Sequence, residues 1–200
     1  MIHRHIDMCQ KLFLIPKKRS KMKIQKRVGE KVIIRNMKNN CKGSIGTINV
    51  NGNKQVYQFC LHKIDIKEKN IDLTNKLDSQ RPLNDYGKGL FCKFRIQEHL
   101  DGKGLYCFVV DKKLKYIGQT ISTFRQRINA GYGNISPYNC YVGGQRTNCH
   151  VNSLINDALN NKKEVLVGFY VMSDDVAIKK LEKELIKETN LVCKGWNLQK

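Results

Sequence analysis

Two short, continuously apolar segments constrain the fold of this chain more than any other feature. The first, LYCFVV, spans 105–110, and the second, EVLVGFYVM, spans 164–172. Apolar runs of this length, rich in β-branched and aromatic residues, are typical of buried β-strands. Asp111 and Lys112 form a turn after the first run, and LKYIG (114–118) follows it. The sequence therefore predicts two consecutive strands and a third one much further along the chain.

Helical patterns separate and follow these strands. Thr123 and Gln126 have the spacing of a capping box and predict a short helix to about Ala130. A second helix is predicted after Asn148, and a third from 173–175 to about Thr189. The resulting ββααβα order predicts an α/β (α+β) domain, a small three-stranded antiparallel sheet flanked by helices.

The region before residue 100 has a different pattern. KVIIR (31–35), SIGTINV (44–50) and KQVYQFCL (54–61) predict strands, and Asn51-Gly52 is a strong hairpin signal. Residues 67–100 are polar and are interpreted as a connector. We therefore predict three parts, a basic N-terminal arm (1–30), a small N-terminal all-β unit with its connector (31–100), and a main domain (101–200).

The charge balance indicates a polyanionic partner. The chain has 37 Lys and Arg residues against 17 Asp and Glu residues, a net charge of +20. Such an excess is typical of proteins that bind nucleic acid. The predicted phosphate contacts lie mainly in segment 16–27, which contains no acidic residue. They are Lys17, Lys18, Arg19, Lys21, Lys23 and, in a later glycine-rich loop, Arg146. The alternative is that segment 16–27 is a solvated basic segment without a binding role.

Other classes of protein are not favoured by the composition. The sequence has no long uncharged apolar run and no signal-peptide pattern, so we predict neither a membrane span nor secretion. The eight cysteines form no C-x-x-C pair, which favours reduced thiols in a cytoplasmic protein. A zinc site is the alternative, because Cys60 is close to His62, and Cys140 and Cys149 are close to His150.

One carboxylate lies on the apolar face of the last predicted helix. At helical spacing, Glu182 falls among Ile178, Leu181 and Leu185, whereas Glu184 falls on the polar side. A buried carboxylate is costly unless a cation or a metal ion offsets its charge. Glu182 is therefore a candidate functional residue, and a structural ion pair or a shifted helix phase is the alternative.

An arginine and two tyrosines form a second set of candidates. Arg127 borders the inward face of the short helix, where its guanidinium can clamp a phosphate or its stem can simply cover the core. Tyr106 and Tyr116 lie on the first two strands. In an antiparallel pair, the numbers of two residues that lie directly opposite each other have a constant sum. If this sum is even, Tyr106 and Tyr116 share a face of the sheet, and if it is odd they lie on opposite faces. The sequence leaves this open.

Together these residues resemble the GIY-YIG nuclease family. Gly104-Leu105-Tyr106 and Tyr116-Ile117-Gly118 are similar to its two signatures, and Arg127, Glu182 and Asn197 follow in the family's order. The resemblance covers about 104–198. It implies that Glu182 binds Mg²⁺ or Mn²⁺ and that Arg127 neutralises phosphoryl charge. It also implies that Tyr106 orients or deprotonates water, with Tyr116 and Asn197 in support.

The chain departs from the family after its arginine. A histidine common in the family is replaced by Gly131 and Tyr132, and His150 is a candidate substitute. The glycine-rich insertion 131–149 resembles those of restriction and homing members. We therefore predict a metal-dependent endonuclease, a site-specific restriction-type enzyme on double-stranded DNA, acting as a homodimer on a symmetric site. A homing or repair-type nuclease, or an inactive basic nucleic-acid-binding protein, is the alternative.

Overall fold

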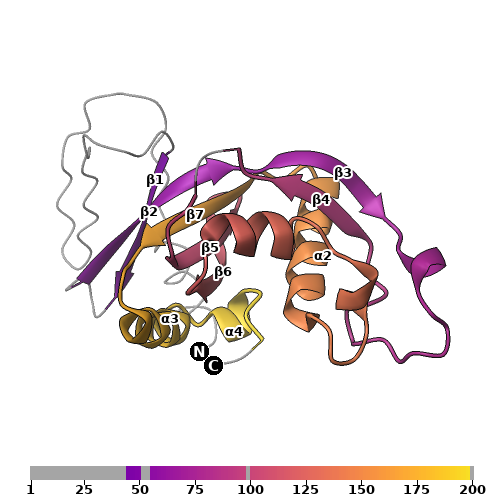
Figure 1. Cartoon of the computed structure of the whole chain (residues 1–200). Helices are drawn as coiled ribbons and strands as arrows, with labels where there is room; N and C mark the ends of the chain where they lie inside the picture. Colours follow the sequence, from indigo (N-terminus) through magenta and orange to yellow (C-terminus); the bar gives the residue numbers. More distant parts are fainter. Residues whose placement is uncertain (1–43, 51–54, 98–99, 199–200) are drawn as a thin grey trace, which may run out of the picture.

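The computed structural model describes residues 44–50, 55–97 and 100–198, and its main element is a curled five-stranded antiparallel sheet (Figure 1). The strands in this sheet follow the order β1-β2-β7-β5-β6. They are β1 (Ser44–Val50), β2 (Gln55–Lys63), β5 (Gly104–Val110), β6 (Lys113–Thr120) and β7 (Val165–Val171). β3 (Asp65–Ile71) and β4 (Phe91–Arg95) pair in a separate two-stranded sheet.

Helices cover both faces of the five-stranded sheet. The π-helix η2 (Gln126–Tyr132) and α2 (Arg146–Asn160) bury Ile128, Tyr132 and Ile155 against one face. α3 (Asp175–Thr189) and α4 (Leu191–Lys194) bury Leu185 and Leu191 against the other. Two short 3-10 helices, η1 (Thr74–Lys76) and η3 (Pro137–Cys140), lie in the connecting loops.

The predicted fold class is wrong in its central feature. The sheet has five strands, and the expected three-stranded sheet in ββααβα order with a separate N-terminal all-β unit is not formed. β2 pairs with the second edge of β7, where Cys60 lies opposite Phe169 and Lys63 opposite Leu166. This pairing covers an apolar edge that a three-stranded sheet would leave open to other chains.

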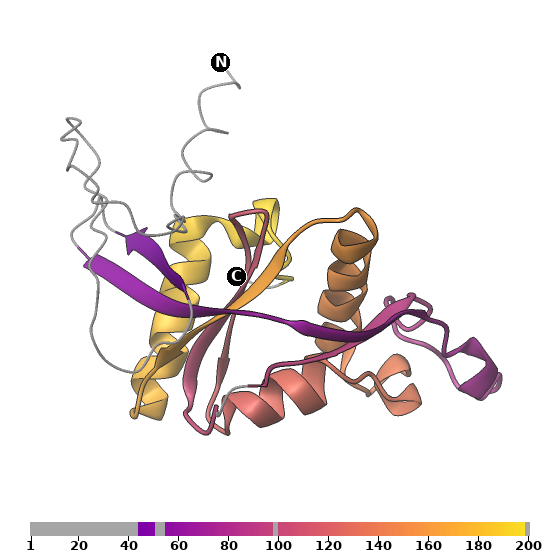
Figure 2. The same ribbon diagram turned by 90° about the horizontal axis from the view of Figure 1, so that it is seen from above.

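Residues 64–97 form a hairpin rather than the predicted connector. Figure 2 shows β2 and β3 as one nearly continuous ribbon that crosses the whole molecule. The hairpin carries residues 72–90, which lie along residues 133–145. The Asn84 N–H donates to the Cys140 carbonyl at 2.8 Å, and the Val142 N–H to that of Pro82 at 3.0 Å. We call these two segments, 72–90 and 133–145, the loop lobe.

Buried asparagines join the hairpin and η2 to α2. The Asn152 amide donates to the carbonyls of Cys92 at 2.8 Å and Tyr132 at 2.6 Å, and its oxygen accepts from the Cys92 N–H at 2.8 Å. One helical turn further on, Asn156 bonds both the backbone and the side chain of Asn70. Asn152 thus ties the end of η2 and β4 to α2, and Asn156 ties β3 to the same helix.

Most of the predicted strands are present, and some predicted segments lie outside the described residues. The strands expected at 44–50, 54–61, 105–110, 114–118 and 164–172 are present, as is the last helix. The basic arm 1–30, the strand at 31–35 and the Asn51-Gly52 turn lie outside the described residues. The division of the chain into three parts remains a prediction. None of the described helices combines the length and apolar character needed to cross a membrane.

The cysteines give a mixed result. Cys92, Cys107, Cys140, Cys149 and Cys193 have free thiols. Cys60 is disulfide-bonded, so the expectation of reduced thiols is wrong at that position. Among the described residues, no three or more histidine, cysteine or acidic side chains gather closely enough to hold a metal ion. The zinc alternative therefore finds no complete ligand set in this part of the chain.

Candidate active site

Arg127 is the centre of a hydrogen-bonded group that we call the arginine–tyrosine cluster. Its Nε donates to the Tyr106 hydroxyl at 3.0 Å, its Nη2 to the Tyr132 hydroxyl at 2.8 Å, and its Nη1 to Oδ1 of Asn148 at 3.1 Å. The Tyr132 hydroxyl lies 3.0 Å from that of Tyr106 and donates to that of Tyr116 at 3.0 Å. Three of the five guanidinium N–H groups are used, which leaves two for a ligand.

The strand register brings the two signature tyrosines together. Tyr106 lies opposite Gly118, and Phe108 lies opposite Tyr116, so paired numbers have an even sum. Tyr106 and Tyr116 therefore share a face, with ring centroids 6.2 Å apart. A Cβ atom at Gly118 would lie 2.5 Å from the Tyr106 hydroxyl oxygen. Glycine is required there because the Tyr106 ring lies directly over the strand.

Sequence reasoning missed Tyr132 and Asn148. The predicted helix ended near Ala130, whereas η2 continues as a π-helix to Tyr132. In a π-helix residues five apart are hydrogen-bonded neighbours, so Arg127 and Tyr132 face each other. Asn148 was expected to cap α2, but α2 begins at Arg146, and the Asn148 side chain bonds Arg127 instead. The only signal for Tyr132 was its place near the family's missing histidine.

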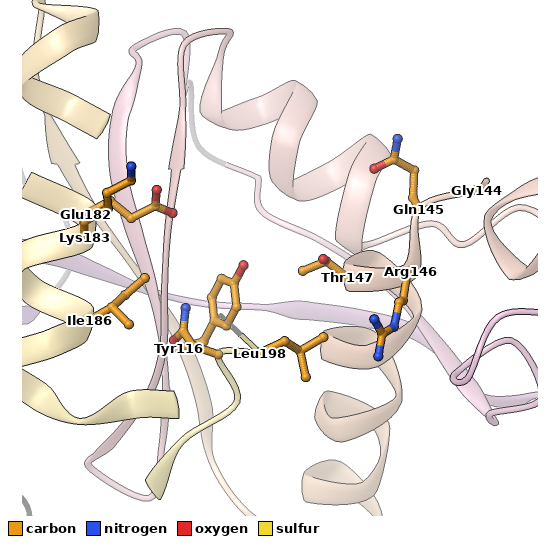
Figure 3. Close-up of a pocket in the computed structure, with 10 residues that line it drawn as sticks. Tyr116, Gly144, Gln145, Arg146, Thr147, Glu182, Lys183, Ile186 and Leu198 are labelled. Carbon is orange, nitrogen blue, oxygen red and sulfur yellow. The ribbon is translucent and has the colours of Figure 1, made fainter. Parts of the chain in front are cut away.

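A pocket of about 600 Å³ opens beside the cluster (Figure 3). Tyr116 forms part of its wall, α3 borders it on one side, and the start of α2 borders it on the other. Figure 3 shows the Glu182 carboxylate directed into this space on the side of the Tyr116 hydroxyl. The lining residues are Tyr116, Gly144, Gln145, Arg146, Thr147, Glu182, Lys183, Ile186, Asn197 and Leu198.

Glu182 takes the inward position that the helical pattern of α3 predicts. Its side chain is partly buried, whereas Glu184 is exposed. Burial raises the pKa of the Glu182 carboxyl, although the backbone N–H of Gln119 and the charge of Arg127 act in the opposite direction. The ionised carboxylate is thus destabilised in the free protein. A cation bound in the pocket would offset that cost.

The phenols of the cluster are held in their neutral form. Burial raises the pKa of Tyr106, Tyr116 and Tyr132 far above the ordinary value, and the charge of Arg127 offsets this only in part. Deprotonation of water by Tyr106 would need a lowered pKa, and the role of Tyr106 toward the attacking water stays a prediction. Tyr106 is also fully buried and does not line the pocket.

Counting protons assigns a direction to the tyrosine hydrogen bonds. Each phenol has one O–H, and that of Tyr132 is used on Tyr116. In the Tyr106–Tyr132 contact Tyr106 is therefore the donor, while its oxygen accepts from Arg127. The Tyr116 oxygen accepts from Tyr132, so the Tyr116 proton is not used within the cluster, and Tyr116 lines the pocket. The cluster thus presents one oriented O–H donor to a ligand.

Asn197 closes the open edge of β6. Its Nδ2 donates to the Ile117 carbonyl at 2.7 Å, and its Oδ1 accepts from the Ile117 N–H at 3.1 Å. The Trp196 N–H also donates to the Lys115 carbonyl at 2.7 Å. Asn197 therefore holds the strand that carries Tyr116. Nε2 of His150 lies 3.1 Å from the carbonyl oxygen of Trp196. No contact between His150 and the arginine–tyrosine cluster is described.

The predicted phosphate contacts are only partly described. Arg146 lines the pocket, pairs with Asp85 at 2.7 Å, and has its guanidinium carbon 5.3 Å from the Tyr86 ring centroid. Both partners of that ion pair are exposed, and such pairs contribute little to stability. Arg146 is therefore available to an anion. Lys17, Lys18, Arg19, Lys21 and Lys23 lie outside the described residues.

Comparisons with known proteins include a distant structural likeness. No family model matches the chain, and no curated protein matches it either. A solved structure of a mutant of bacteriophage T4 EndoII is similar at 22% identity and a TM-score of 0.33. The match covers 55% of this chain and 82% of that one. At that distance the likeness carries no argument about activity, which must come from the site itself.

Proposed function

We propose that this protein is a GIY-YIG-type endonuclease that hydrolyses phosphodiester bonds in double-stranded DNA with the help of a divalent cation. The observation that carries the proposal is the arginine–tyrosine cluster beside the pocket that Glu182 enters. A guanidinium, a hydroxyl donor and a carboxylate that can hold a metal ion are groups able to stabilise the charge that develops in phosphoryl transfer. The two signature motifs and the net charge of +20 agree with a DNA substrate.

Two groups of the chain would stabilise charge on the scissile phosphate. Arg127 keeps two N–H donors beyond its described bonds, and a guanidinium matches phosphoryl oxygens in geometry and charge. Tyr116 donates its remaining O–H into the pocket. Donors positioned before the reaction stabilise the transition state without reorganisation. Tyr116 lines the pocket and contacts the substrate there. The fully buried Tyr106 positions Arg127, which does not line the pocket itself but is only partly buried and acts from the cluster beside it.

Glu182 would hold the cation. The donor set fits Mg²⁺ or Mn²⁺, because a hard ion of this kind accepts a single carboxylate and keeps several waters around it. Burial raises the pKa of this carboxyl, and a bound cation would favour its ionised form. When bound, the ion would supply positive charge to the phosphoryl and leaving oxygens.

The hydrolysis can be written without a deprotonated tyrosine. Water adds to the phosphorus, the bond to the 3′ oxygen breaks, the attacking water loses a proton to solvent, and the 3′ oxygen gains one. The neutral phenols of Tyr106, Tyr116 and Tyr132 take no proton in this scheme. Their function is to hold Arg127 and one hydroxyl proton in place.

The decisive experiment compares two neighbouring carboxylates of α3. Wild-type chain, Glu182→Gln and Glu184→Gln are incubated with supercoiled plasmid and Mg²⁺ or Mn²⁺. We expect cleavage by wild type and by Glu184→Gln, and a loss of about 100-fold or more in Glu182→Gln. An intact plasmid with the wild-type protein, or loss of activity only in Glu184→Gln, refutes the proposal. Sequenced product ends separate a site-specific enzyme, with discrete ends, from a general nuclease.

A further inference from the structure

An arginine and an exposed tyrosine form a second polar and aromatic group in the loop lobe. The guanidinium carbon of Arg81 lies 4.1 Å from the centroid of the Tyr141 ring and 5.9 Å from that of Tyr138. Tyr141 is buried, whereas Tyr138 is 61% exposed. Among the ion pairs formed by described residues, none includes Arg81. Arg81 is exposed, so its guanidinium is accessible to an anion from solvent while it lies over the Tyr141 ring.

The turn that carries the exposed ring is held by hydrogen bonds, although the ring itself buries little surface. Tyr138 belongs to η3, where Ser136 and Asn139 form a capping box, with the Ser136 N–H 2.9 Å from Oδ1 of Asn139. Nδ2 of Asn84 donates to the Asn139 carbonyl at 2.8 Å. A backbone fixed in this way loses little conformational freedom when a partner packs on the ring that it carries. The geometry is thus organised in advance for contact.

This group adjoins the rim of the proposed active site. A Cβ atom at Gly144 would lie 2.4 Å from the Tyr138 carbonyl oxygen, so the η3 turn sits directly on Gly144. Gly144 and Arg146 line the pocket, and Arg146 lies over Tyr86 in a second arginine–tyrosine contact. Figure 1 shows the loop lobe extending sideways beyond the sheet, next to α2. A long polymer leaving the pocket on this side would pass over the lobe.

A nucleic-acid strand fits these groups better than an acidic protein does. Arginine edges bind phosphates, and an exposed tyrosine ring offers a stacking face for a base or a sugar. The net charge of +20 favours the same partner. We propose that Arg81 and Tyr138 bind the DNA flanking the cut, with Arg81 on a phosphate and Tyr138 against a nucleoside. This inference rests on the proposed nuclease function.

Binding without cleavage tests the inference separately from the activity. All proteins carry Glu182→Gln, and fluorescence anisotropy follows a labelled mixed-sequence duplex at several salt concentrations. We expect Tyr138→Ala to weaken binding about tenfold with an unchanged salt dependence, while Tyr138→Phe binds as the parent does. Arg81→Gln should weaken binding and reduce the salt slope by about one. Thermal unfolding of the exposed Tyr138 variants should match that of the parent.

Arg95→Gln is the matched control. Arg95 is exposed, pairs with Asp65, and lies at the end of β4 opposite Asp65, whereas the lobe joins the other end of this hairpin. The inference is overturned if Arg81→Gln and Tyr138→Ala bind within twofold of the parent, or if Arg95→Gln loses as much affinity as Arg81→Gln. If the variants bind DNA as predicted here, but the protein with an intact Glu182 does not cut plasmid, the proposed nuclease function is refuted and the proposed DNA contacts are not.

Discussion

Replacing Tyr132 with phenylalanine removes one oxygen atom from the centre of the arginine–tyrosine cluster. The hydroxyl accepts from Nη2 of Arg127 at 2.8 Å, lies 3.0 Å from the Tyr106 oxygen, and donates to the Tyr116 oxygen at 3.0 Å. The ring itself remains, so the contact of the Arg127 guanidinium with its face at 4.4 Å is retained. The substitution therefore isolates the hydrogen bonds from the packing.

The expected cost follows from the number and type of these bonds. Two bonds between neutral phenols are worth about 1 kcal/mol each, and one bond from a guanidinium about 1.5–3 kcal/mol. Arg127 keeps its bonds to Tyr106 and Asn148, which limits the loss. We expect the free energy of unfolding to fall by about 2–4 kcal/mol. A domain with ordinary stability of about 5–15 kcal/mol still folds after such a loss.

The same change should lower turnover more than affinity for DNA. Without Tyr132 nothing fixes the direction of the Tyr116 hydroxyl, and Arg127 loses one of its three restraints. We expect kcat to fall about 10- to 100-fold, or about 1.4–2.8 kcal/mol, while KM changes less than about threefold. Urea denaturation and plasmid cleavage measure the two effects. Tyr170→Phe, a partly buried ring on the other face of the sheet, is the control and should change neither quantity.

If Tyr132→Phe is as stable as the wild-type protein and turns over DNA at the same rate, this reasoning is refuted. A loss of stability with an unchanged kcat would show that the cluster is only a buried structural element. A proportional rise in KM would place Tyr132 in substrate binding, which its complete burial argues against.

Three further predictions concern Glu182, Gly118 and Asn197. Burial raises the pKa of Glu182, so its ionised form costs stability above that pKa, and Glu182→Gln should unfold at higher urea concentration than wild type near about pH 8. This advantage should vanish as the pH falls through the raised pKa, and Mg²⁺ should raise the melting temperature of wild type alone. Gly118→Ala should cost about 1–3 kcal/mol and displace Tyr106, as seen in near-UV circular dichroism. Asn197→Leu should cost about 1–2 kcal/mol by urea denaturation, because Ile117 loses both edge bonds.

Local periodicity was sufficient to predict several parts of this molecule. The apolar runs at 105–110 and 164–172 correspond to β5 and β7, and the phase of α3 placed Glu182 inward and Glu184 outward. These features follow from neighbours within a few residues of one another. The backbone period alone decides which side chains share a face of a strand or a helix.

Only the tertiary structure decided how these parts combine. The pairing of β2 with β7 and the even register of β5 with β6 join segments whose hydrophobic patterns permit other partners. The π-helical end of η2 depends on amides that α2 supplies, and it brings Tyr132 against Arg127. Contacts between segments that are distant in the sequence depend on how the complete core packs. No local pattern records them, and for this reason the roles of Tyr132 and Asn148 in the cluster were not predicted from the sequence.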